Sequence, residues 1–159
     1  MAAITAAMVG ELRAKTDAPM MECKKALEVV GGDIEKAIEE LRKSGAAKAG
    51  KKAGRIAAEG AIAIVTTQNG KRAIMMEVNS ETDFVARDAN FTNFVKAVAD
   101  TALQANEQDV TKLSSLPLQG TDQTVEEARQ TLVTKVGENV QIRRIMLSHP
   151  AAATVGTYT

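Results

Sequence analysis

The sequence contains few of the residues on which most enzyme sites and disulfide-bonded folds depend. Its 159 residues include one cysteine, three phenylalanines, one histidine and no tryptophan. Cys23 has no intramolecular partner for a disulfide, which indicates a reducing compartment. His149 lies beside Pro150 with no nucleophile motif around it, and no Cys/His pair has the spacing of metal ligands. We therefore expect no catalytic residue, no metal site, no cofactor and no enzymatic activity.

The chain also lacks a net charge and a long apolar run. Lys plus Arg and Asp plus Glu number 20 each, so the protein has no net positive charge that would attract it to nucleic acid or to an anionic membrane. Glu11 and Arg13 interrupt the stretch in which a signal peptide would be apolar. The Gly70-Lys71 pair lacks the glycine-rich run of a phosphate loop. We expect a cytoplasmic protein without a membrane partner and without direct nucleotide binding.

Residues 1–45 predict a small domain of three short helices. Apolar residues recur at helical spacing in each segment, and Pro19, the Gly31-Gly32 pair and Gly45 mark where helices begin or end. Asp33 suits the N-cap of the third helix. Hydrophobic residues make up 45 % of the chain and are mostly aliphatic, which favours a largely helical core. A bundle of this size buries little surface and is marginally stable alone.

Residues 46–55 predict a basic linker that is partly helical. Four cations, Lys48, Lys51, Lys52 and Arg55, lie among alanines and glycines. Two interpretations remain open, a solvated linker and a contact with RNA, and we favour the linker. Because no base-stacking aromatic lies nearby, any RNA contact would be nonspecific and sensitive to salt.

Residues 56–159 predict a core domain of strands and helices. Two β-rich runs flank Asn69-Gly70, which is the strongest short-range signal for a hairpin. Helical patterns follow at residues 90–104 and 124–137, with a polar loop between them, and residues 140–149 predict a further strand able to pair with the hairpin. The predicted fold class is α+β, with an antiparallel sheet packed with helices behind the three-helix domain.

The stretch NSETDFVARDANF, residues 79–91, combines carboxylates with one of the three phenylalanines. It connects a predicted strand with a predicted helix. Phe84 is either displayed at the surface or folded back under the helix as a core plug. The neighbouring carboxylate of Asp83 favours display, because an unpaired carboxylate resists burial.

The adjacent pair Met20 and Met21 raises a similar alternative. Neighbouring residues on a helix point about 100° apart, so a small bundle cannot easily bury both. Either one methionine, or the apolar stem of Lys24, faces outward and suits an adaptable protein contact, or both methionines pack into the core. Cys23 fits the bundle interior as a small buried hydrophobe.

Several segments together resemble the bacterial elongation factor Ts family. They occur in the family's order and cover nearly the whole chain: MMECKKAL (residues 20–27), DIEKA, LRKSG, KKAG, TDFV (residues 82–85) and KVGENVQIRR (residues 135–144). The resemblance implies a guanine-nucleotide exchange factor in translation elongation and protein biosynthesis. Its partner would be elongation factor Tu, the GTPase that delivers aminoacyl-tRNA to the ribosome, and its N-terminal domain would be UBA-like.

The resemblance also implies roles for individual residues. Thr82, Asp83, Phe84 and Val85 would push into the nucleotide-binding domain of elongation factor Tu, disturb its Mg²⁺ site and loosen GDP. Val136 occupies a position that is usually isoleucine in the family, so its contact with the same domain would be kept but weaker.

Three residues of the second predicted helix would complete the contact with the partner. Met20, Met21 and Lys24 would dock on the nucleotide-binding domain as part of the N-terminal bundle.

The sequence departs from the family in length. Family members continue well beyond residue 159, so the resemblance covers their N-terminal half, and we expect a fragment or a shortened form. Two alternative functions stay open at this point. One is an RNA-binding accessory protein that uses residues 48–55, and the other is an interaction bundle without exchange activity.

Overall fold

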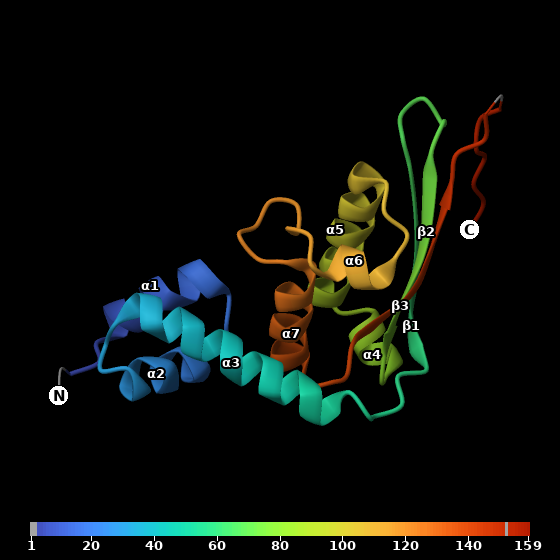
Figure 1. The fold of residues 1–159 in the computed structure, drawn as a ribbon. Helices are drawn as coiled ribbons and strands as arrows, with labels where there is room; N and C mark the ends of the chain where they lie inside the picture. The colour runs from blue at the N-terminus through green and yellow to red at the C-terminus, as the bar shows by residue number, and fades with distance from the viewer. Residues whose placement is uncertain (1–2, 152) are drawn as a thin grey trace.

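The computed structural model describes residues 3–151 and 153–159, and within them it has an α+β fold of seven helices and one three-stranded sheet. The elements follow in the order α1 (Ala6–Thr16), α2 (Met20–Val29), α3 (Ile34–Lys52), β1 (Glu59–Thr66), β2 (Ala73–Ser80), α4 (Asp83–Ala86), α5 (Ala89–Ala105), α6 (Val110–Ser114), α7 (Val125–Val136) and β3 (Gln141–Ser148). Helices α1 and α2 lie at one end of the molecule, the sheet lies at the other, and α7 lies between them (Figure 1). The predicted fold class is confirmed, while the UBA-like arrangement stays a prediction.

The first three helices share a small core of their own. Leu12, Cys23, Leu27 and Ala37 are its fully buried members. The Asp33 side chain accepts a hydrogen bond from the backbone N–H of Lys36 at 3.0 Å and so caps α3 as predicted. Burial raises the pKa of the Cys23 thiol, which disfavours the reactive thiolate. The prediction that Cys23 is a buried hydrophobe is confirmed.

The prediction that the third helix ends at Gly45 is wrong. Helix α3 continues to Lys52, and Gly45 and Ala49 are both buried. A Cβ atom added at Gly45 would lie 3.9 Å from the Thr134 hydroxyl oxygen, an ordinary contact distance, so α7 packs directly over this position of α3. Packing against α7 offsets the low helix propensity of glycine, which is roughly 1 kcal/mol worse than alanine. The division of the chain into domains stays a prediction.

The sheet is antiparallel throughout, with the strand order β1-β2-β3. Thr66 pairs with Ala73 at the end of the hairpin, and the turn contains Gly70 at a φ of 63°. Ile74 of β2 pairs with Leu147 of β3, so the third strand adds to the hairpin. Both the hairpin and the pairing of the third strand are confirmed.

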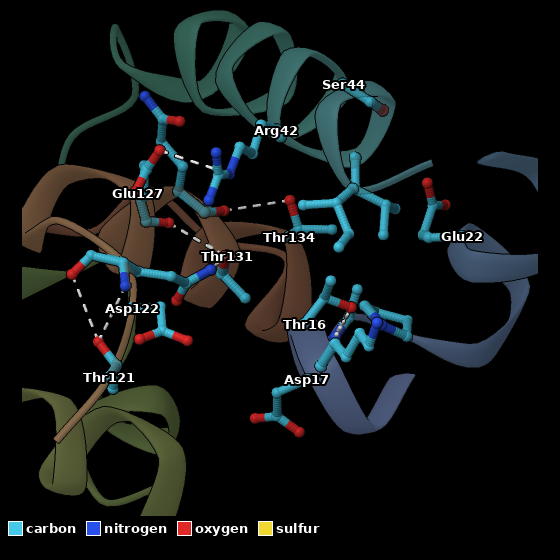
Figure 2. A pocket seen from close by; sticks show the side chains of 18 of the residues that line it. Thr16, Asp17, Glu22, Arg42, Ser44, Thr121, Asp122, Glu127, Thr131 and Thr134 are labelled. Carbon is cyan, nitrogen blue, oxygen red and sulfur yellow. Dashed lines mark hydrogen bonds and ion pairs between the residues drawn. The ribbon is translucent and has the colours of Figure 1, made fainter. Parts of the chain in front are cut away.

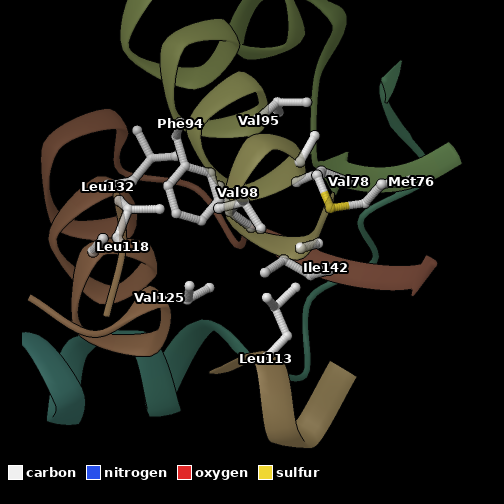
Figure 3. Packing of buried hydrophobic residues seen from close by; sticks show 14 of the residues in the cluster. Met76, Val78, Phe94, Val95, Val98, Leu113, Leu118, Val125, Leu132 and Ile142 are labelled. Atoms are coloured by element: carbon white, nitrogen blue, oxygen red, sulfur yellow. The ribbon is translucent and has the colours of Figure 1, made fainter. Parts of the chain in front are cut away.

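Helix α5 and its neighbours cover one face of the sheet and form the larger core. Figure 3 shows Phe94 and Val98 of α5 between Leu132 of α7 and Ile142 of β3. Phe91, also on α5, is fully buried in the same cluster. The amphipathic pattern that predicted a helix at residues 90–104 therefore reflects this covered face. In the part of the chain that the structure describes, no helix has the length and apolar character needed to cross a bilayer.

A glycine in β1 makes a close backbone approach that should not tolerate a side chain. Gly60 has a φ of 145°, and a Cβ atom there would lie 2.1 Å from the Val78 carbonyl oxygen. We expect Gly60→Ala to lower the free energy of unfolding by more than about 1 kcal/mol, through both strain and overlap. Gly10, inside α1, has open space around it, so Gly10→Ala should raise the same quantity by roughly 0.5–1 kcal/mol. Urea denaturation compares both variants with the parent, and a Gly60→Ala protein as stable as the parent would contradict the prediction.

Candidate functional site

We call residues 82–85, which are predicted to push into a partner, the wedge segment. They form the N-cap and the first three residues of α4, a single helical turn between β2 and α5. The Thr82 hydroxyl caps α4 by accepting a hydrogen bond from the backbone N–H of Val85 at 3.4 Å. Val85 packs partly against the larger core, whereas Phe84 is 83 % exposed. The Asp83 carboxylate is also at the surface and pairs with Arg87 at 3.3 Å. The prediction that Phe84 is displayed rather than buried is confirmed, and its role stays a prediction.

Two carboxylates fix the start of α4 to the connection between α7 and β3. The Glu138 carboxylate accepts hydrogen bonds from the backbone N–H of Glu81 at 3.1 Å and from the backbone N–H of Thr82 at 3.0 Å. It also accepts one from the Thr82 hydroxyl at 2.6 Å. In return, the Glu81 carboxylate accepts a hydrogen bond from the backbone N–H of Asn139 at 2.7 Å. We call these four residues, Glu81, Thr82, Glu138 and Asn139, the carboxylate clamp.

The end of α3 joins the clamp from a third direction. The side-chain amide of Asn139, which is 2 % exposed, donates to the Arg55 carbonyl oxygen at 2.8 Å. The Arg55 guanidinium lies 3.5 Å from the Glu81 carboxylate. Lys52 donates to the Gly137 carbonyl oxygen at 2.7 Å, just after the last residue of α7. Three helices, α3, α4 and α7, therefore meet in one polar network.

A further carboxylate caps α5, the helix that follows α4. Asp88 is the N-cap of α5 and accepts hydrogen bonds from the backbone N–H of Asn90 at 2.8 Å and from its side chain at 3.0 Å. These bonds, led by the backbone one, lower the pKa of Asp88 below its usual value. The charged form of Asp88 thus stabilises the start of α5.

Val136 lies two residues before Glu138, which binds the start of the wedge segment. Val136 is the last residue of α7 and packs partly against the larger core. It precedes Gly137 and Glu138, and the latter holds Thr82. The residues predicted for Mg²⁺ dislocation and the predicted contact at Val136 thus belong to one region.

The other predicted contact residues lie far from this region, on α2 at the opposite end of the molecule (Figure 1). Met20 and Met21 are 54 % and 62 % exposed, so the structure displays both methionines. Lys24 is exposed beside them, 3.9 Å from Glu28. The predicted partner contacts therefore form two separate surfaces.

The basic segment is largely engaged within the protein. Lys48 pairs with Glu22, Lys52 binds the Gly137 carbonyl, and Arg55 pairs with Glu81. These contacts leave fewer free cations than the composition indicated for an RNA contact.

A groove of about 660 Å³ separates the N-terminal helices from α7 and the loop that precedes it (Figure 2). Arg42 of α3 reaches Glu127 of α7 at 3.5 Å across it. Lys135 of α7 pairs with Asp17, after α1, at 2.7 Å. None of the predicted site residues lines this groove. Within residues 3–151 and 153–159, no cluster of three or more His, Cys, Asp or Glu side chains could hold a metal ion.

Comparison with known proteins identifies the family of this chain. A family model described as Elongation factor TS matches residues 81–159. An elongation factor Ts of Arthrospira platensis is 54 % identical over 158 residues, which are 99 % of this chain and 63 % of the relative. An elongation factor Ts of Acinetobacter baumannii is 60 % identical over 144 residues, which are 91 % of this chain and 48 % of the relative. The chain belongs to the elongation factor Ts family.

The family model covers the α4 surface and not the residues on α2. The family model begins at Glu81, so its range contains the whole carboxylate clamp together with Phe84 and Val136. The chain spans between about half and two thirds of the length of these elongation factor Ts relatives. The activity and the partners of the whole protein therefore remain matters for proposal.

Sequence reasoning missed the clamp. In the sequence, Glu81 is one of several carboxylates near Phe84, and Glu138 and Asn139 lie within KVGENVQIRR with nothing to mark them. The available signal was weak: two polar residues directly after Gly137, which ends α7 at a φ of 77°. Their partners lie more than 50 residues earlier in the chain, and no short-range pattern connects them.

Proposed function

We propose that this chain binds elongation factor Tu carrying GDP, disturbs the partner's Mg²⁺ site and promotes release of GDP. Family membership supports a role in translation elongation. The observation that carries the proposal is Phe84, a large aromatic side chain that is 83 % exposed on a short helix fixed at its start. Exposure of such an apolar side chain to water is unfavourable in the free protein, and its burial against a partner is favourable.

In the proposed mechanism, α4 enters the partner's nucleotide-binding domain with Phe84 leading. Asp83 would bring a negative charge near the groups that hold Mg²⁺, while Thr82 and Val85 support the turn from behind. Burying one phenylalanine contributes roughly 1.5–3 kcal/mol, and each 1.4 kcal/mol is about tenfold in affinity. Phe84 alone could therefore weaken GDP binding roughly ten- to a hundredfold, and lost Mg²⁺ contacts would add to this.

The proposal requires no covalent chemistry, so the protein would act as a displacer and not as an enzyme. Linkage makes the effect reciprocal: if the chain weakens the binding of GDP, GDP weakens the binding of the chain by the same factor. A cytoplasmic location agrees with such a partner.

A second surface would add binding energy without touching the nucleotide site. Met20 and Met21 are exposed, and an adaptable methionine side chain suits a contact that must form and dissolve repeatedly. Lys24 would supply charge beside them, and Val136 would press on the partner near α4. Two separate clusters of buried hydrophobic residues support a division into an N-terminal domain, residues 1–45, and a core domain, residues 56–159. Of residues 46–55, between these ranges, Ala49 packs in the core cluster.

Stopped-flow release of a fluorescent GDP analogue tests the proposal. Elongation factor Tu loaded with the analogue is mixed with excess GDP, with and without this chain, over a range of chain concentrations. We expect the release rate to rise with chain concentration and to reach a plateau. A folded chain that leaves the rate unchanged at every concentration would contradict the proposed function.

A further inference from the structure

We infer that Glu138 is a positioning residue that holds α4, and with it the exposed ring of Phe84, in the orientation used for exchange. The inference deepens the proposed function and rests on it for the consequence in exchange. Its structural part, the hold of Glu138 on α4, can be judged independently of any partner.

Helix α4 cannot hold its own orientation. It has four residues, whereas isolated helices shorter than about 12 residues are marginal in water. Phe84 contributes little packing because its ring faces solvent, and Val85 and Ala86 are only partly buried against the larger core. The direction of Phe84 therefore depends on what fixes Thr82, the residue that begins the turn.

Glu138 fixes Thr82 through three hydrogen bonds to its carboxylate. Its two carboxylate oxygens accept from the backbone N–H groups of Glu81 and Thr82 and from the Thr82 hydroxyl. Hydrogen bonds to an ionised acceptor are roughly twice as strong as neutral ones. The Thr82 hydroxyl donates to Glu138 and still accepts from Val85, so a single side chain links Glu138 to the interior of α4.

Glu138 is itself held at a defined place. Gly137 ends α7 immediately before it, and Asn139, buried immediately after it, donates its backbone N–H to Glu81. Each of the two carboxylates thus binds the backbone beside the other, and a rotation of α4 would have to break both sets of bonds.

The hydrogen bonds that Glu138 already makes favour a positioning role over a direct contact between Glu138 and the partner. Three donors of this chain already use the carboxylate, and the residue is only partly exposed. The effect of Glu138 on a partner would therefore act through Phe84. Removing the charge should leave Phe84 present but variable in direction.

Glu138→Gln tests the inference because it keeps the size of the side chain and removes the charge. We expect faster deuterium uptake at the amides of Glu81 and Thr82 in the isolated protein. In the GDP-release assay we expect a loss of about tenfold in the acceleration, which corresponds to 1.4 kcal/mol. Phe84→Ala and the double variant complete a mutant cycle, in which Glu138→Gln should cost little more once Phe84 is absent.

Glu127→Gln is the matched control. Glu127 also accepts a backbone N–H at the start of a helix, that of Thr124 at 2.9 Å, but it lies on the groove side of α7 and away from α4. This variant should leave the deuterium uptake of residues 81–85 and the GDP-release rate as in the parent. Melting curves of both variants show how much stability each has lost.

Two results would overturn the inference. One is deuterium uptake at Glu81 and Thr82 that is unchanged by Glu138→Gln. The other is an equal loss of GDP release from Glu138→Gln with and without Phe84, which would mean that Glu138 acts by another route. If the parent chain does not accelerate the release of GDP from elongation factor Tu, the proposed function fails. Deuterium uptake alone then decides whether Glu138 holds α4.

Discussion

Replacing Phe84 with alanine is expected to reduce the acceleration of GDP release roughly ten- to a hundredfold, because the wedge loses the area that one buried phenylalanine provides. The fold should be unaffected, since the ring is 83 % exposed and packs on little of the core. Stopped-flow release at equal chain concentration measures the effect, and urea denaturation checks that the free energy of unfolding stays within about 0.5 kcal/mol of the parent.

Met146→Ala is the control for loss of an exposed apolar side chain. Met146 lies on β3 and is 57 % exposed, and it belongs to neither proposed contact surface. It should leave GDP release unchanged. If Phe84→Ala is as active as the parent, the wedge is not Phe84, and the exchange activity must depend on other residues of the chain.

Replacing Phe91 with alanine should lower the stability of the fold and leave the acceleration of GDP release largely unchanged. Phe91 is fully buried where α5 packs in the larger core, so its truncation leaves a cavity. We expect a loss of about 3–5 kcal/mol in the free energy of unfolding, a large part of the 5–15 kcal/mol that typically separates folded from unfolded domains. Urea denaturation followed by circular dichroism measures it.

The contrast between Phe91 and Phe84 is the informative outcome. At a temperature well below its unfolding midpoint, folded Phe91→Ala protein should still accelerate GDP release. A stability loss below about 1 kcal/mol would mean that the core reorganises around the missing ring, against the close packing typical of protein interiors.

Local chemistry predicted much of the fold. The Asn69-Gly70 turn and its flanking strands, the helix at Ala89–Ala105 and the helix at Val125–Val136 each follow from a pattern within a short stretch. The display of Phe84 also followed from a local conflict between an aromatic ring and its acidic neighbours. Such features can be predicted because the residues that decide them are adjacent in the chain.

The features that could not be predicted depend on distant partners. A glycine such as Gly45 is a common stop signal for a helix, and α3 continues past it where it packs against α7, a contact that the local sequence does not reveal. Glu81 and Glu138 look like surface carboxylates until the fold places each against the backbone beside the other. Nothing in the sequence near Met20 and Met21 decided that both would face outward.

The continuation of α3 has a consequence for how two distant contacts could work together. A segment rich in alanine, glycine and lysine would act as a flexible tether if it were unfolded, and each contact would then search for its target separately. As part of a 19-residue helix, at about 1.5 Å of rise per residue, it instead acts as a spacer of set length. Met20 and Phe84 would then approach one surface as fixed points of a single body, so the freedom lost on association is lost only once.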